Sequence, residues 1–141
     1  MTNEQGDGLT DAQRQEAAAG DLNVLAILMF IGSAIFSGVN VWAGSLHWIA
    51  ALATVASTGA TAYGLLQRNE VIAAFTKIGF GFGGLGAPLF GIVGLILGFF
   101  GVLWGWALLA GAVLYFGFSI LGLEILERAE QTGVIERYEA S

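Results

Sequence analysis

The chain has 141 residues, of which 56% are apolar and only 11% are charged, against about 25% charged residues in an ordinary soluble domain. Together with a mean hydropathy of +0.75, this composition predicts an integral membrane protein with room for about four spans of ~20 residues each and for no second folded domain. Cysteine is absent, which excludes disulfides, thiolate metal sites and cysteine nucleophiles.

Residues 1–21 are polar and acidic and have no apolar periodicity. We expect a mostly disordered cytoplasmic tail there, with at most a turn of helix over residues 11–19. The tail lacks the short basic stretch that directly precedes the apolar core of a secretory signal. The first apolar run is therefore expected to be retained as a membrane span.

Four apolar runs follow, and their spacing predicts an all-α membrane domain over residues 22–126, built as two helical hairpins in one four-helix bundle. A short turn at 43–45 separates the first two runs, and a polar segment at 67–70 ends the first hairpin. We expect the spans at residues 22–42, 46–66, 82–103 and 106–126, followed by a cytoplasmic C-terminal tail at 127–141.

The stretch between the two hairpins is too long for a simple loop. Residues 71–78 place their large apolar side chains on one helical face, so we predict a short interfacial helix before the third span. The glycine-rich run 79–84 is then a flexible entry into that span, because it lacks the lysine and the preceding strand of a phosphate-binding loop. Pro88 falls near the start of the span, where a proline costs least or produces a kink.

Charge placement predicts the orientation. With four spans, every basic residue falls on one side of the membrane, and the positive-inside rule makes that side cytoplasmic. The tryptophans fall at the two turns on the other side, where the headgroup level favours them. We therefore expect a multi-pass protein of the cell membrane with both termini in the cytoplasm. The basic residues are Arg14, Arg68, Lys77, Arg128 and Arg137, and the tryptophans are Trp42, Trp48, Trp104 and Trp106.

Small residues recur at steps of three and four along the third span and predict a helix-packing face on a single helix. Lipid provides no hydrophobic driving force for helix association, so helices in a membrane associate through close packing. A stripe of small residues lets two backbones approach closely enough for such packing. The second span has a similar stripe, so we expect spans 2 and 3 to pack within one chain, with a glycine-lined oligomer around a pore as the alternative. The first stripe is Gly84, Ala87, Gly91, Gly94, Gly98, Gly101 and Gly105, and the second is Ala50, Ala53, Ser57, Ala60 and Gly64.

Three polar residues are candidate sites, whereas the hydroxyls of the spans are expected to bond carbonyls one turn back or to join helices. Asn40 has more hydrogen-bonding positions than one local backbone contact satisfies, and interfacial water near the outer surface is the alternative. His47 is expected to be a hydrogen-bonding turn residue, with a haem ligand in a larger complex as the alternative. Glu124, about 27 Å from Trp106 along the helix, is predicted to be an interfacial carboxylate within reach of Arg128.

We find no pattern in the sequence that supplies a catalytic, metal or cofactor site, so no enzymatic activity is expected. His47 has no second histidine or carboxylate on its side for a metal, the spans have no carboxylate at mid-depth, and no basic patch suits nucleic acid. We expect a structural or accessory component of a membrane assembly, whose partners are the lipid bilayer and other membrane subunits or further copies of the chain. A channel or small transporter is the alternative.

The chain has eleven acidic and five basic residues. This excess of acidic residues fits adaptation to high salt or docking of a basic cytoplasmic partner.

Overall fold

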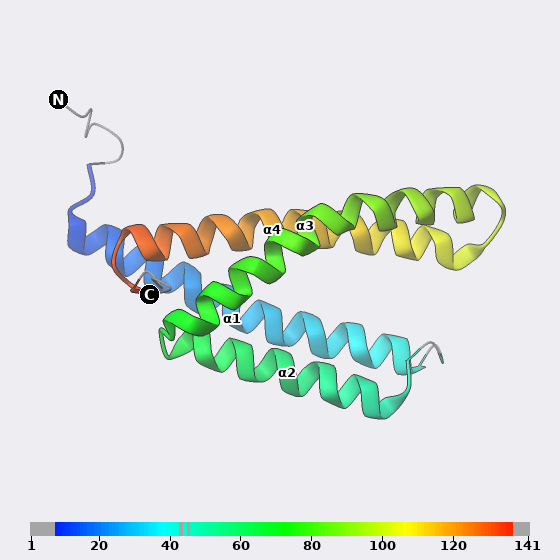
Figure 1. Cartoon of the computed structure of the whole chain (residues 1–141), viewed down its shortest axis with the longest axis horizontal. Coiled ribbons are helices and arrows are strands. Elements are labelled where there is room, and N and C mark those ends of the chain that lie inside the picture. Colours follow the sequence, from blue (N-terminus) through cyan, green and yellow to red (C-terminus); the bar gives the residue numbers. More distant parts are fainter. Residues whose placement is uncertain (1–7, 43, 45, 137–141) are drawn as a thin grey trace. The chain divides into compact units, whose positions relative to one another are not determined.

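The computed structural model describes residues 8–42, 44 and 46–136, and within them it contains four helices and no strand. The helices are α1 (Asp11–Trp42), α2 (Trp48–Leu66), α3 (Glu70–Phe99) and α4 (Leu103–Gln131), as Figure 1 shows. The expected all-α class is confirmed. Each helix is long and apolar enough to cross a membrane, so four candidate spans indicate a multi-pass membrane protein.

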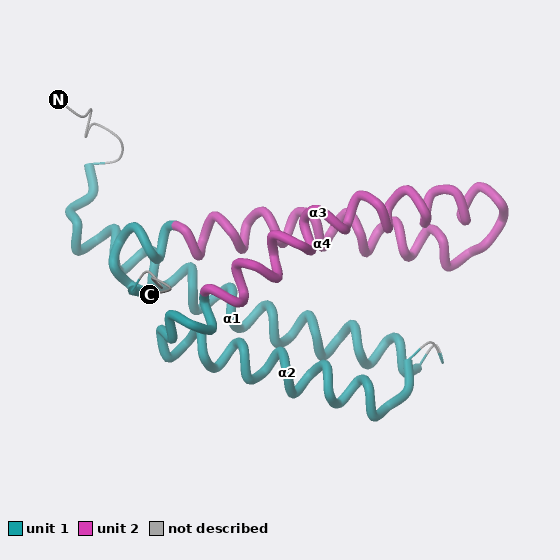
Figure 2. The backbone as a smooth tube through the Cα atoms, viewed as in Figure 1, with its two compact units in different colours: residues 1–73, 128–141 teal, residues 74–127 magenta. Residues whose placement is uncertain are grey.

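The chain divides into two compact units, which Figure 2 colours separately. Unit 1 comprises residues 1–73 and 128–141, and unit 2 comprises residues 74–127. Unit 1 therefore contains α1, α2, the first turn of α3 and the end of α4. Unit 2 is the hairpin formed by the rest of α3 and α4.

Helix α1 begins earlier than the sequence analysis predicts. Residues 11–21, expected to lie in a mostly disordered tail, are helical and continuous with the first span. Thr10 and Gln13 form a reciprocal capping box, in which the Thr10 N–H donates to Gln13 Oε1 (2.9 Å) and the Gln13 N–H donates to Thr10 Oγ1 (3.3 Å). This box starts the helix at Asp11, while the part of the predicted tail at 1–7 lies outside the described residues.

The predicted interfacial helix is also part of a longer element. Residues 71–78 are helical, but α3 runs from Glu70 to Phe99 without a break at the glycine-rich segment 79–84. The start of α3 is fixed by Asn69, whose Oδ1 accepts from the Ile72 N–H at 3.1 Å. Glycines remain helical here because a backbone in an apolar medium has no other hydrogen-bond partners. Pro88 consequently lies inside α3 rather than near its start, and Figure 2 shows the helix changing direction within unit 2, as an internal proline favours.

The turn between α3 and α4 comes earlier than expected. Helix α3 ends at Phe99, and Gly101 follows with a φ of +82°. The Val102 N–H donates to Leu97 O (3.0 Å) and the Gly101 N–H donates to Gly98 O (3.1 Å), which is the Schellman pattern of helix ends. Only a residue that adopts positive φ readily fits the position of Gly101, so the chain turns there. Helix α4 then begins at Leu103.

The core of unit 1 lies where α1 and α2 run side by side as an antiparallel pair. Leu22 and Leu25 of α1 and Leu65 of α2 are almost completely buried. Ala129 near the end of α4 and Ile135 beyond it are buried as well, so this part of the segment expected to be a C-terminal tail is packed within unit 1. Burial of these side chains supplies the apolar packing that holds unit 1 together.

Candidate functional site

The small-residue stripe of the third span lies along two helices and not along one. Gly84, Ala87, Gly91, Gly94 and Gly98 belong to α3, Gly101 forms the turn, and Gly105 belongs to α4. The prediction of a single helical face is therefore wrong at its C-terminal end. Gly91, Gly94, Gly98 and Gly105 nevertheless lie in one interface between α3 and α4, because the chain folds back at Gly101 and brings Gly105 against α3.

Gly94 and Gly105 mark the closest approach of α3 and α4. A Cβ atom built on Gly94 would lie 2.7 Å from both Gly105 O and Leu109 N. A Cβ atom built on Gly105 would lie 2.5 Å from Gly98 N and 2.8 Å from Gly94 O. These neighbours are backbone atoms, which cannot move aside as a flexible side chain can. The two helices thus pack backbone to backbone at this point, as small residues allow in membranes.

Farther from the turn, aromatic side chains of one helix occupy the space left by glycines of the other. A Cβ atom on Gly122 would lie 2.5 Å from the Phe80 ring, and one on Gly83 would overlap the Tyr115 ring. Phe80 also packs edge-on against Phe118, with ring centroids 5.7 Å apart. Sequence reasoning missed Gly83 and Gly122 because they lie outside the three-and-four register of the stripe. A glycine on one helix that lies opposite an aromatic residue on the other could have identified these contacts. Such a match can be recognised only once it is known that α3 and α4 pair.

Within unit 2, the α3 glycines pack against α4. The nearest atoms to Gly91, Gly94 and Gly98 belong to α4, and the predicted packing of spans 2 and 3 stays a prediction. In the second stripe, Ala50, Ala53, Ser57 and Ala60 are exposed, and Gly64 is buried against Ile72 at the start of α3. Helix α2 instead turns a different face inward, formed by Ala51, Ala62 and Leu65.

The hydroxyls of α2 follow the prediction of local bonding. The Oγ1 atoms of Thr54, Thr58 and Thr61 donate to the carbonyls one turn back at 2.9, 2.8 and 3.0 Å. Three serine hydroxyls behave differently: those of Ser33, Ser37 and Ser119 are buried and have no hydrogen-bond partner within the described part of the chain. Buried polar groups of this kind are uncommon in proteins.

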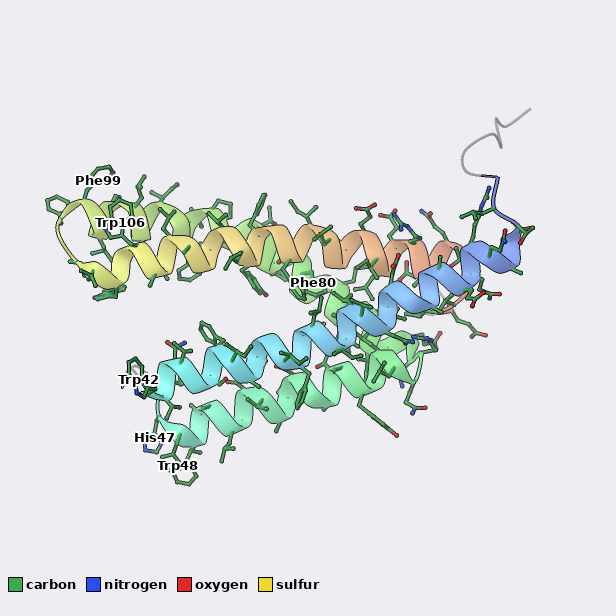
Figure 3. The ribbon with its side chains drawn as sticks, turned by 180° about the vertical axis from the view of Figure 1, so that it is seen from behind. Trp42, His47, Trp48, Phe80, Phe99 and Trp106 are labelled. Atoms are coloured by element: carbon green, nitrogen blue, oxygen red, sulfur yellow. The ribbon has the colours of Figure 1, made fainter. Side chains whose placement is uncertain are left out.

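Asn40 and His47 both make local hydrogen bonds near the α1–α2 turn, where Figure 3 shows Trp42, His47 and Trp48 close together. The Asn40 Nδ2–H donates to Phe36 O at 2.8 Å. His47 precedes α2, and its Nδ1 accepts from the Ile49 N–H at 3.3 Å. His47 is therefore the N-cap of α2, a specific form of the turn role predicted for it.

Within unit 1, Arg128 and Arg68 each contact α1. Arg128 Nη1 lies 3.3 Å from Asp21 Oδ2, in an ion pair whose two side chains are about half exposed. Arg68 Nη2 donates to Ala19 O at 3.5 Å, and its Nη1 donates to Leu65 O at 3.4 Å. The pairing of Glu124 with Arg128 stays a prediction. Glu124 is an exposed residue of α4.

In the residues that the structure describes, no group of three or more histidine, aspartate or glutamate side chains is arranged to hold a metal ion. Comparison of the chain with models of protein families, with curated proteins and with solved structures found no match.

Proposed function

We propose that this chain is a non-catalytic structural or accessory component of a membrane assembly. The observation that carries the proposal is the α3–α4 interface, in which Gly94 and Gly105 bring two backbones together. A glycine in a helix costs about 1 kcal/mol relative to alanine, so repeated glycines are retained where close helix approach compensates for that cost. The spans thus use their residues for packing, as a scaffold within a membrane does.

We further propose a single four-helix bundle with both termini in the cytoplasm and with the first turns of α3 at the interface. The support is that Arg14, Arg68 and Arg128 lie at helix ends that this orientation places inside, with Lys77 in the first turns of α3. Helices α1, α3 and α4, at 32, 30 and 29 residues, exceed the ~20 residues that cross a bilayer, so their inner ends extend beyond it. Single cysteines test the orientation: Leu103→Cys should react with an impermeant thiol reagent from outside, whereas Gln67→Cys and Gln131→Cys should not. Labelling at Gln67 in intact cells would contradict the four-span orientation.

The partners of this role are other membrane subunits or further copies of the chain. Purification from native membranes in mild detergent, followed by mass spectrometry, should recover stoichiometric partners or an oligomer of defined size. A monomer that carries ions across liposomes without any added protein would contradict the accessory role. The excess of acidic residues in the chain suits a basic cytoplasmic partner. Dissociation of that partner when the salt concentration is raised would identify the contact as electrostatic.

A channel or small transporter is the second candidate, and the buried serines favour it. Ser33 and Ser37 of α1 bury hydroxyls without partners in the described residues, and such groups within spans often lie along the path of a polar solute. Liposome flux decides between the two candidates. Ser37→Ala should reduce flux if the hydroxyl lines a path, and Glu124→Gln should abolish proton-linked flux only if that exposed carboxylate couples transport.

A further inference from the structure

A shallow hollow runs along the outside of the α1–α2 pair in unit 1. It has a volume of about 240 Å³, and its walls are apolar, with Ala26 and Phe30 on α1 and Gly59, Tyr63 and Leu66 on α2. Gly59 contributes no side chain, and the Phe30 ring lies 3.2 Å from the place where its Cβ would be. The hollow therefore exists because small residues stand between larger ones at the depth of the membrane spans.

Arg68 lies beyond the inner end of this hollow. Its guanidinium donates to Ala19 O on α1. Ala19 and Ala26 are seven residues apart, which places them on the same helical face and about 10 Å apart along α1. The guanidinium consequently lies in line with the hollow, about 10 Å from the Ala26 end of its wall.

The charge of Arg68 is compensated by carbonyl oxygens alone within the described residues. Its two hydrogen bonds, to Leu65 O and Ala19 O, are long at 3.4 and 3.5 Å, and no carboxylate lies within ion-pair distance of it in that part of the chain. An arginine side chain has five N–H donors arranged to bind a phosphate through two of them. Most of this donor capacity is unused in the protein itself.

The backbone of Arg68 is unusual as well. It has a φ of +59°, and the Asn69 N–H donates to Gly64 O at 3.0 Å, so Arg68 occupies the Schellman position that glycine normally takes. The corresponding residues after α3 and α4 are Gly101 and Gly133, both with positive φ. An arginine at such a position strains the backbone, and strained residues are concentrated at functional sites.

We propose that the hollow and Arg68 together bind one phospholipid with an anionic headgroup. The phosphate lies on the Arg68 guanidinium, and one acyl chain lies in the apolar hollow. The headgroup layer of a bilayer is roughly 5–8 Å thick on each side, so the ~10 Å between guanidinium and hollow places the phosphate and the start of the acyl chain at suitable depths. The chain carries a net charge of −6, which repels anionic surfaces in general. Selective retention of an anionic lipid would therefore reflect this site and not the overall charge.

Native mass spectrometry of the purified full-length protein tests the proposal. The protein in detergent is mixed with phosphatidylglycerol or phosphatidylcholine at equal concentrations, and the fraction of protein with one bound lipid is measured. We expect phosphatidylglycerol to be retained preferentially. Arg68→Gly, which suits the positive φ and should keep the fold, is expected to lower that retention roughly tenfold, the loss typical of one charge-assisted hydrogen bond.

Two further variants separate the headgroup from the acyl contact. Arg14→Gln removes one exposed positive charge of α1 and should leave retention unchanged. Gly59→Leu fills the hollow without touching Arg68 and should lower retention of both lipids, and an unchanged elution volume and thermal midpoint verify that this variant remains folded. Equal losses in Arg14→Gln and Arg68→Gly, equal retention of both lipids by the parent, or undiminished binding to folded Gly59→Leu would each overturn the proposal. Protein dimers in place of lipid adducts, lost in Gly59→Leu, would assign the hollow to a second copy of the chain and overturn it too.

Discussion

Replacing Gly94 by alanine tests the backbone-to-backbone contact of α3 and α4 most directly. The new Cβ would lie 2.7 Å from Gly105 O and from Leu109 N, whereas ordinary van der Waals contact begins at 3.4 Å. The helices must therefore separate by about 0.7 Å at this point. A gap of this size forfeits a quarter to a half of the dispersion energy of the atom pairs beside it.

Two opposing effects set the size of the change. Alanine is a better helix former than glycine by about 1 kcal/mol, which stabilises the variant. Overpacking against a rigid neighbour costs about 1–3 kcal/mol, and two backbone neighbours place Gly94 in the upper part of that range. We expect a net destabilisation of about 1–2 kcal/mol. At Gly98 the obstacle is a side chain and not the backbone, namely the Trp106 ring, which is 47% exposed, so the loss should be smaller.

Gly86→Ala is the matched control, because Gly86 lies on the same helix and has no atom within 4 Å of its Cβ position. Thermal unfolding of the three variants in detergent, followed by tryptophan fluorescence, should give a lower midpoint for Gly94→Ala by a few degrees. The Gly86→Ala midpoint should equal or exceed that of the parent. Equal midpoints for Gly94→Ala and Gly86→Ala would show that the close approach of α3 and α4 does not contribute to stability.

Substitutions at three further positions have defined expectations. Gly101→Ala should destabilise by about 1 kcal/mol, because alanine resists a φ of +82°, and Gly101→Asn should restore part of the loss in the same unfolding assay. His47→Ala should cost about 1 kcal/mol by removing the N-cap of α2, whereas His47→Asn should retain stability, and identical losses would show that the Nδ1 contact is not a cap. Ser119→Ala should be neutral or stabilising, because it removes a buried hydroxyl without a partner in the described residues, and a clear loss of stability would reveal a contact of that hydroxyl.

Much of the fold follows from the hydropathy of the sequence. The four apolar runs predict four helices, and the breaks at 43–45 and 67–70 match the connections between α1, α2 and α3. The helix ends were harder to predict because they depend on hydrogen bonds of single residues. Thr10 and Gln13 extend α1 by a capping box, a pattern readable in the sequence once a helix is suspected there. Arg68 follows the end of α2 and has a positive φ. Arginine has no preference for positive φ, so the residue type does not predict this helix end.

The helix-packing stripe could be predicted only in part, because the spacing of small residues does not indicate where a helix ends. Gly98 and Gly105 are seven residues apart and would lie on one face of an uninterrupted helix. In the structure they lie on opposite helices, with the Gly105 Cβ position 2.5 Å from Gly98 N. Both arms of a tight hairpin need small residues where they meet, so the same spacing arises across a turn as along a helix. The distinguishing feature is Gly101, whose positive φ makes it a turn residue within an otherwise helical register.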